Sequence, residues 1–232
     1  MDLNNLNMSS KPRKRTGIHQ EGRKMLLGVA LFVFILVLVA YFYWPNWTFA
    51  TILALSALAL VFVIYFFRDP VRVFTIDDPN YLVAPADGKV VVIEPVMENE
   101  YFHAERLQVS IFMSPFNVHA NWYPVEGTIL KSEHQAGNHK AAWLPKSSTE
   151  NERSLVVIQT KTNAVIAVRQ IAGAMARRIV TYAREGKECH RNTHLGFIKL
   201  GSRVDMYLPL NTEMLVELGD NVRGNETIIG KL

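Results

Sequence analysis

The chain has 232 residues, of which 49% are hydrophobic and 20% charged, and its formal net charge is +4. Residues 1–24 contain six Lys or Arg and two Asp or Glu, so this tail carries the whole excess and residues 25–232 are balanced. A basic nucleic-acid-binding surface is therefore excluded as the source of the charge. The single cysteine, Cys189, excludes an intrachain disulfide and fits a reducing compartment.

Two long uncharged segments follow the basic tail. Residues 25–44 and 47–67 are 20 and 21 residues long, and a helix of that length crosses a hydrocarbon core of about 30 Å. Neither segment has a polar stripe, so a soluble fold would have to surround both completely. Pro45-Asn46 separates them as a helix-breaking pair. The sequence therefore predicts a transmembrane helical hairpin over 25–67.

Charges and aromatic residues predict how the hairpin is oriented. Six basic residues precede the first span, two follow the second, and aromatic residues gather at the turn between the spans. We therefore expect both flanks on the cytoplasmic side of the cell (inner) membrane, with the turn at the opposite interface. A cleaved signal peptide fits less well, because a second span follows at once and no small-residue cleavage site separates the two.

From Arg68 onward the chain has the composition of a mainly β domain. Short β-branched stretches alternate with Gly, Pro, Asn and Asp, which is typical of strands joined by turns. Residues 174–183 fit either a strand or a short helix. Strands are expected at 89–93, 108–112, 127–132, 154–160, 164–170, 197–200, 203–208 and 227–230.

Two segments of this domain, 84–90 and 217–227, look like the turn-strand units of lipoyl-type barrel-sandwich hybrids. This likeness concerns the fold and not the chemistry. The expected organisation is a basic tail (1–24), a transmembrane hairpin (25–67) and a barrel-sandwich-hybrid-like β catalytic domain (68–232).

The pair Gly201-Ser202 stands inside a strand-like stretch and carries the sharpest chemical hypothesis. A serine hydroxyl that loses its proton can attack the preceding peptide carbonyl and convert the amide to an ester. Elimination then leaves dehydroalanine, which hydrolyses to a pyruvoyl group. Gly201 has no side chain to block the attack. The alternative for this pair taken alone is an ordinary turn or bulge.

Three segments that occur in order strengthen this hypothesis: 82–90 (LVAPADGKV), 112–121 (FMSPFNVHAN) and 197–205 (FIKLGSRVD). Together they resemble the phosphatidylserine decarboxylase family, in its short membrane-anchored, pyruvoyl-dependent type. The resemblance extends to 67–72, 125–128 and 172–179, and covers the chain from about Arg68 to Leu232.

The resemblance implies decarboxylation of phosphatidylserine to phosphatidylethanolamine and CO2 in phospholipid biosynthesis. Removal of the carboxylate needs an electron sink, which a pyruvoyl group derived from Ser202 supplies through a Schiff base with the substrate amine. Self-cleavage between Gly201 and Ser202 would leave a large chain (1–201) and a small chain (202–232) that stay together as a heterodimer, with a higher homo-oligomer also possible.

Members of the family have a serine-protease-like Asp-His-Ser set for self-processing. By resemblance, Asp87 takes the carboxylate position and His119 matches the first histidine of a His-x-x-His segment found in long-form members. Trp122 stands where the second histidine is expected. The processing base is therefore either His119 or His139.

Other polar residues leave further roles open. The spacing of His134, His139, His190 and His194 fits no recognised metal motif, and the sequence implies no metal. A lipid phosphate or the substrate carboxylate would suit one of four arginines, among which the sequence does not choose: Arg68, Arg72, Arg177 and Arg178.

Two alternative functions belong to other classes. A close relative would decarboxylate another serine-headgroup lipid, such as an archaetidylserine-like ether lipid, by the same chemistry. A non-enzymatic adaptor would be a membrane-tethered β module with an intact chain, in which Gly201-Ser202 is only a turn.

Overall fold

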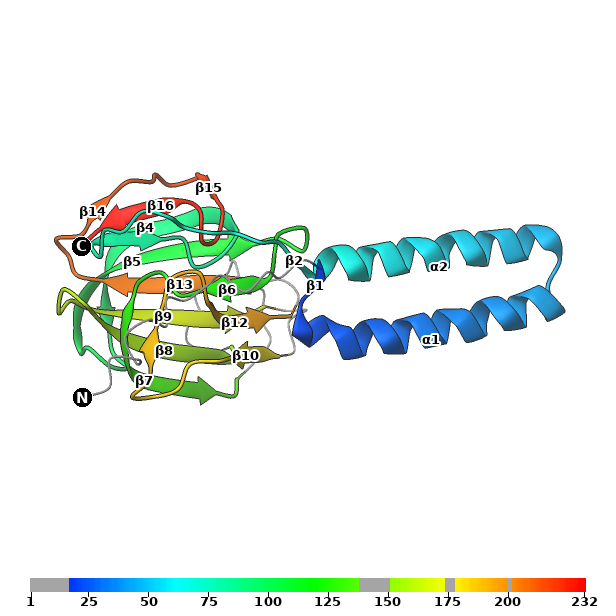
Figure 1. Ribbon diagram of the computed structural model, residues 1–232, viewed down its shortest axis with the longest axis horizontal. Coiled ribbons are helices and arrows are strands. Elements are labelled where there is room, and N and C mark those ends of the chain that lie inside the picture. The colour runs from blue at the N-terminus through cyan, green and yellow to red at the C-terminus, as the bar shows by residue number, and fades with distance from the viewer. Residues whose placement is uncertain (1–16, 138–150, 174–177, 200–201) are drawn as a thin grey trace, which may run out of the picture.

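A long helical hairpin projects from one end of a β-rich domain in the computed structural model (Figure 1). The structure describes residues 17–137, 151–173, 178–199 and 202–232. The fold is mainly β with a helical hairpin before it, as the sequence predicts.

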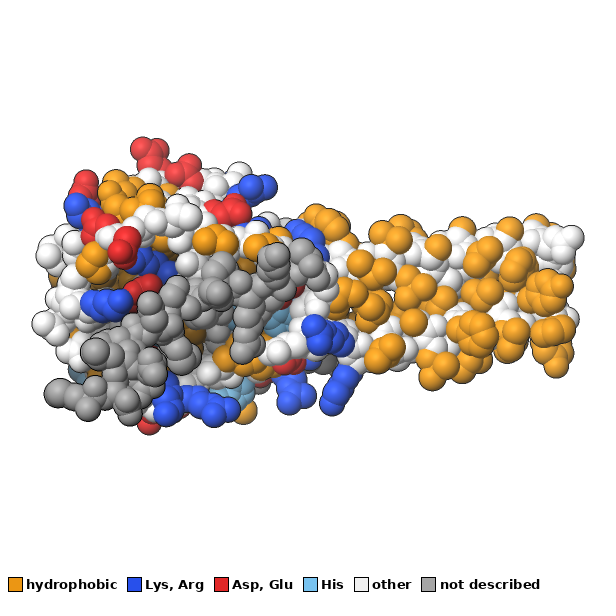
Figure 2. Space-filling model, viewed as in Figure 1, with side chains coloured by type: hydrophobic (Ala, Val, Ile, Leu, Met, Phe, Trp, Pro, Cys, Tyr) orange, Lys and Arg blue, Asp and Glu red, His pale blue; other side chains and the backbone are white. Residues whose placement is uncertain are grey.

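The hairpin consists of α1 (Gln20–Tyr43) and α2 (Asn46–Phe66). α1 begins five residues before the apolar span, because His19 caps it: the His19 Nδ1 accepts a hydrogen bond from the Glu21 N–H at 3.3 Å. Both helices are long and apolar enough to cross a membrane. Hydrophobic side chains cover their surface in Figure 2, as expected for helices that face lipid.

One eight-stranded antiparallel sheet forms the body of the β domain. The order of its strands is β11-β7-β8-β9-β13-β5-β4-β15. The bounds are β4 Gly88–Glu98, β5 Ala104–Met113, β7 Gly127–Gln135, β8 Arg153–Thr160, β9 Val165–Ala172, β11 Glu188–Cys189, β13 Ser202–Leu208 and β15 Asn221–Val222.

Three smaller antiparallel sheets complete the domain. Two have the orders β10-β12-β6 and β14-β16-β3, and β1 pairs with β2 at the base of the hairpin. The bounds are β1 Gly17–Ile18, β2 Arg68–Asp69, β3 Tyr81–Val83, β6 Ala120–Trp122, β10 Ile179–Thr181, β12 His194–Ile198, β14 Glu213–Met214 and β16 Ile228–Lys231.

The main hydrophobic core lies between the large sheet and the two three-stranded sheets. Fully buried Ile111 and Val204 come from the large sheet, while Leu195 and Ile229 come from the smaller ones. A second cluster joins the domain to the hairpin, where Phe66 and Phe67 pack with Trp122 and Phe197. The hairpin is therefore attached through buried aromatic contacts in addition to the chain itself.

Most of the predicted strands are confirmed, with shifted ends. The strand expected at 197–200 begins earlier, at His194, and the one expected at 203–208 begins at Ser202. Within 174–183 the described part contains the strand β10, and 174–177 lie outside the described residues. Strands of two or three residues were not predicted, because so short a stretch shows no alternation.

The two segments that resemble barrel-sandwich units lie against each other. Asn221 and Val222 pair with Lys89 and Gly88 in the β15–β4 ladder. Gly88 is required at this point, because a Cβ there would collide with the carbonyl oxygen of Phe112.

Candidate active site

Ser202 is the first residue of β13, an interior strand of the large sheet. It lies opposite Met113 of β5 on one side and Ala172 of β9 on the other, and it is fully buried. Because side chains alternate along a strand, Ser202 shares a face with Val204 and Met206, which belong to the main core. The hydroxyl is thus held in a water-poor position at one end of β13.

Among the described residues, the hydroxyl of Ser202 has one acceptor, and it is a weak one. Its Oγ donates to the Sδ of Met113 at 3.3 Å, and a thioether sulfur accepts hydrogen bonds poorly. Gly201, the other half of the predicted cleavage site, lies outside the described residues. The serine is therefore positioned by the sheet more than by a strong hydrogen bond.

His119 ends the loop that connects β5 to β6. Its backbone oxygen accepts from the Ile198 N–H at 3.2 Å, and Ser202 lies opposite the last residue of β5. The ring stacks near Phe66 at the foot of α2, with 4.2 Å between the ring centroids. His119 and Ser202 therefore both belong to the end of the domain that faces the hairpin.

The protonation state of His119 follows from its surroundings. The Nδ1 lies 3.0 Å from the carbonyl oxygen of Asn117, so this nitrogen carries the proton. The Nε2 is buried and has no hydrogen-bond partner among the described residues. Burial lowers the pKa of His119 to about 4, and the Asn117 carbonyl opposes that effect only in part. At neutral pH, His119 is a neutral imidazole, and the lone pair on its Nε2 accepts no hydrogen bond from the described residues.

A local hydrogen-bonded turn sets the position of His119. The Oδ1 of Asn117 accepts from the backbone N–H of Ser114 at 2.9 Å and from its hydroxyl at 2.7 Å. Such side-chain to backbone bonds are typical of Asn and Ser in turns. The Ser114–Asn117 turn therefore closes the loop directly before the histidine.

Asp87 is held by an arginine and two backbone groups. Arg72 donates from both terminal nitrogens, one to each carboxylate oxygen. The Gly224 N–H donates to Oδ1 at 2.9 Å, and the Val118 N–H points at Oδ2 at 3.4 Å. No hydrogen bond joins Asp87 to His119, although Val118 directly precedes the histidine. The carboxylate therefore acts on the His119 loop through its backbone.

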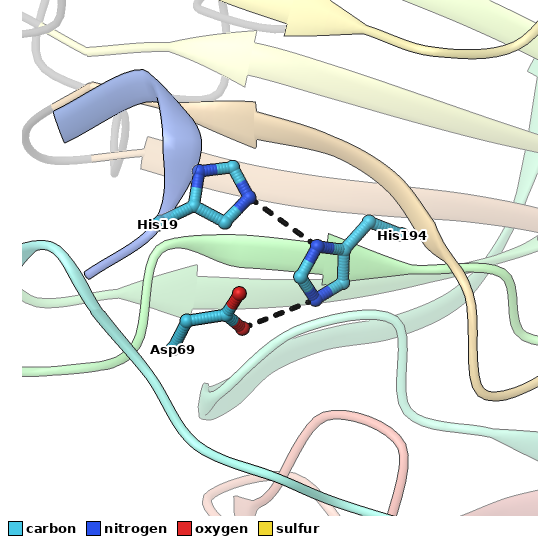
Figure 3. A group of neighbouring side chains, drawn as sticks. All are labelled: His19, Asp69 and His194. Atoms are coloured by element: carbon cyan, nitrogen blue, oxygen red, sulfur yellow. Dashed lines mark hydrogen bonds and ion pairs between the residues drawn. The ribbon is translucent and has the colours of Figure 1, made fainter. Parts of the chain in front are cut away.

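A second buried carboxylate lies at the base of the hairpin (Figure 3). The His19 Nε2 and His194 Nδ1 are 3.3 Å apart, and the other ring nitrogen of His194 lies 3.4 Å from an oxygen of Asp69. These three offer ligand atoms within 4.8 Å of one another. Since His194 turns a different nitrogen to each neighbour, the arrangement is that of a hydrogen-bonded chain, and it links β1, β2 and β12.

The group of His19, His194 and Asp69 also contacts Trp122, the residue that stands where long-form members have a second histidine. Trp122 lies opposite His194 in the β6–β12 ladder, and the two rings meet edge to face with 5.1 Å between centroids. The same indole lies 5.2 Å from the Arg72 guanidinium. Trp122 thus fills the space between the Arg72–Asp87 pair and the His194–Asp69 pair.

The other candidate residues named from the sequence differ in whether the structure shows their partners. Arg72 is engaged with Asp87, while Arg68 lies at the end of α2 and donates to the carbonyl of Phe116 at 2.8 Å. His139 and Arg177 lie outside the described residues. Burial raises the pKa of the Cys189 thiol to about 12, so this cysteine is not a thiolate nucleophile at neutral pH.

A small apolar pocket lies where the hairpin meets the domain. Its lining is Met25, Phe62, Val63, Phe66, Phe67 and Lys199. Lys199 is the one charged residue in this lining and stands three positions before Ser202. The sequence did not indicate this pocket, because its walls come from both helices of the hairpin and from Lys199, which lies more than 100 residues farther along the chain.

Comparisons with known proteins identify the relatives of this chain. The model of the phosphatidylserine decarboxylase family matches residues 59–230. The chain is 53% identical over 225 residues to a phosphatidylserine decarboxylase proenzyme of Bacteroides thetaiotaomicron, with 96% of this chain and 98% of the relative covered. Proteins of the same description from Phocaeicola vulgatus and Cytophaga hutchinsonii are 50% and 47% identical, and each comparison covers more than 90% of both chains.

The match spans both the hairpin and the β domain, and the region matched by the family model includes Asp87, His119 and Ser202. The chain therefore belongs to the phosphatidylserine decarboxylase family.

Proposed function

We propose that this chain is a self-cleaving, membrane-anchored enzyme that converts phosphatidylserine to phosphatidylethanolamine and CO2 for phospholipid biosynthesis. The observation that carries the proposal is the placement of a buried serine and a neutral histidine at the end of the domain that faces the hairpin. A lipid substrate would reach this end without leaving the membrane interface.

Self-cleavage would begin at the hydroxyl of Ser202. The oxygen gives up its proton, bonds to the carbonyl carbon of Gly201, and the Gly201–Ser202 C–N bond breaks as the nitrogen takes up a proton. Loss of the Cα proton then breaks the Cβ–Oγ bond and releases the Gly201 carboxylate. Addition of water and departure of ammonia leave a pyruvoyl group at the start of the small chain.

His119 is the proposed proton acceptor. It is neutral at physiological pH, its Nδ1 is committed to Asn117, and its Nε2 lone pair has no partner among the residues described. A base must be unprotonated and within reach of the proton it takes. His139 stays the alternative processing base, as its surroundings lie outside the described residues.

Asp87 contributes in this proposal by holding the His119 loop. Its carboxylate accepts from the Val118 N–H and pairs with Arg72, so its negative charge stays beside the imidazole without binding it. That charge favours the protonated form of His119, which arises when the histidine takes a proton.

The two products would remain together through strand pairing. β13 opens the proposed small chain and pairs along its length with β5, and with β9 over all but its last residue. Farther along, β15 pairs with β4 and β16 with β3. The small chain of residues 202–232 is thus bound on several sides by strands of the large chain, 1–201.

The pyruvoyl group supplies a carbonyl that takes up the electrons left behind when CO2 departs. This chain's own residues would bind and orient the lipid around it. The apolar pocket lined by Met25 and Phe66 would take at most a short part of an acyl chain, and Lys199 in its lining carries a positive charge suited to a phosphate. His119 packs against Phe66 at the foot of α2.

In this proposal the hairpin would hold the site at a membrane, and the charge pattern supports a β domain on the cytoplasmic face of the inner membrane. Six basic residues before α1 and two after α2 favour retention of both flanks on that side.

Intact-mass measurement of the purified full chain tests the proposal. We expect a large fragment ending at Gly201 and a 31-residue fragment with a pyruvoyl N-terminus, which borohydride links to the amine of added phosphatidylserine. A single unmodified full-length mass would overturn the proposal. Parallel incubations with other serine-headgroup lipids determine whether phosphatidylserine is the preferred substrate.

A further inference from the structure

A buried hydrogen-bonded network of polar side chains links neighbouring strands and ends at Met113, the residue that Ser202 also contacts. The Ser154 hydroxyl donates to the Oε1 of Gln170 at 2.7 Å, and the Gln170 Nε2 donates to the Oδ1 of Asn121, also at 2.7 Å. The Asn121 Nδ2 then points at the Met113 sulfur at 3.7 Å. All of these polar residues are fully buried, so water does not compete for their hydrogen bonds.

Each amide of this network has one direction in the structure. The Ser154 hydroxyl donates to the Gln170 oxygen, and the Gln170 nitrogen faces Asn121. The Asn121 oxygen is then occupied, and its NH2 group is directed toward Met113. Gly196 closes the other side, since a Cβ there would lie 2.8 Å from the Gln170 nitrogen.

The direction of this amide matters because of what lies at its end. The same Met113 sulfur that receives Asn121 also receives the Ser202 hydroxyl. A thioether is a poor acceptor, so the Asn121 NH2 group is buried next to the sulfur that the serine hydroxyl also contacts, and this sulfur is a weak partner for both. A donor of this kind gains a better acceptor when an oxygen next to it acquires negative charge.

We propose that Asn121 is a catalytic residue of self-cleavage, which donates from Nδ2 to the oxygen of Ser202. That oxygen gains negative charge as it loses its proton, and again when the Cβ–Oγ bond breaks. This inference rests on the proposed function, and it assigns Gln170 and Ser154 the role of positioning the Asn121 amide.

The test measures the rate of cleavage of full-length chains synthesised without cells in the presence of lipid nanodiscs. Asn121→Leu keeps the approximate volume and removes the donor, so cleavage should slow by about 100-fold. The matched control Ser110→Ala changes another fully buried serine of the large sheet, whose hydroxyl accepts from the Gln108 amide. It should cleave within about threefold of the wild type, because the hydrogen bonds of Asn121 and Gln170 are unchanged.

Asn121→Asp provides a readout that a structural role alone would not produce. The aspartate keeps an oxygen for Gln170, and its neutral form offers an O–H donor whereas its ionised form offers none. Among folded molecules separated by gel filtration, the cleavage rate relative to the wild type should fall as pH rises from 5 to 8. This variant also tests the role of Asn121 as a donor if Asn121→Leu does not fold.

The outcomes separate this inference from the proposed function. A wild-type chain that stays intact defeats both. A wild-type chain that cleaves, together with equal slowing in Asn121→Leu and Ser110→Ala or a pH-independent ratio for Asn121→Asp, defeats only the role of Asn121.

Discussion

Two groups of polar atoms at the same end of the β domain differ sharply in how well they are satisfied. Each oxygen of Asp87 receives one hydrogen bond from Arg72 and one from a backbone N–H. By contrast, the Ser202 hydroxyl has a sulfur as its acceptor, and the His119 Nε2 has no partner among the described residues. The first group is saturated with hydrogen bonds, and the second contains the atoms to which the proposed function assigns the chemistry.

The difference is instructive because both groups are buried. Buried polar atoms without good partners raise the free energy of the folded state, so they persist where chemistry uses them. In the proposed function, the fully hydrogen-bonded Asp87 therefore has a supporting role, and the less well bonded Ser202 and His119 have the chemical roles.

The largest effect is expected at the serine. Ser202→Ala removes the attacking oxygen, so cleavage and lipid decarboxylation should both disappear, as measured by intact mass and by CO2 release. The control Ser110→Ala changes another fully buried serine of the sheet and should leave cleavage intact. Any cleaved product from Ser202→Ala would contradict the assignment.

His119→Asn tests the histidine as a base. Asparagine can still donate to the Asn117 carbonyl but has no equivalent of the Nε2 lone pair, so the cleavage rate should fall by about 100-fold or more. His134→Asn alters a largely exposed imidazole and serves as the control. If both variants cleave normally, His119 is not the processing base and His139 becomes the residue to test.

Arg72→Met addresses the paired group. Asp87 would keep its charge in a buried site without its guanidinium, which should lower the free energy of unfolding by about 3–5 kcal/mol in detergent. Arg72→Met combined with Asp87→Asn should recover part of the loss. Arg223→Met, at an exposed ion pair, should change stability little. An unchanged stability in Arg72→Met would remove the distinction between the two groups.

The pH dependence of stability gives a smaller effect. The pKa of His119 is about 4 in the folded state and about 6.5 in an unfolded chain, so the unfolded state binds a proton first as pH falls. The free energy of unfolding should therefore decrease as pH falls from about 6.5 to 4, by about 3 kcal/mol at most. Subtracting the pH profile of His119→Asn isolates this contribution, and parallel profiles would contradict the lowered pKa.

The fold was largely predictable because its signals are local. Each span of the hairpin is apolar along its whole length, and the longer strands show β-branched runs between turn residues. The short strands β3, β6 and β15 were missed, since what defines them is pairing with distant segments.

The site was predictable only in part. Ser202, Asp87 and His119 were found through resemblance to a family, and the structure places all three at or near the end of the domain facing the hairpin. The engagement of Arg72 with Asp87 was not foreseen, nor was the chain that joins His19 to His194 across 175 positions of sequence. No local sequence pattern indicates such pairs, because the two residues of each pair are far apart in the sequence.

The sequence by itself determined the two membrane-length helices and the β-rich domain, and it supplied Ser202 as the candidate reactive serine, because composition, periodicity and a specific run of residues are properties of contiguous chain. Only the tertiary structure decided the partner of each polar side chain. Hydrogen bonds and burial depend on distances between strands, and those distances arise when the sheets pack. Asn121 shows this dependence, since its side-chain oxygen accepts from Gln170, whose own oxygen accepts from Ser154, and these residues come from three different strands.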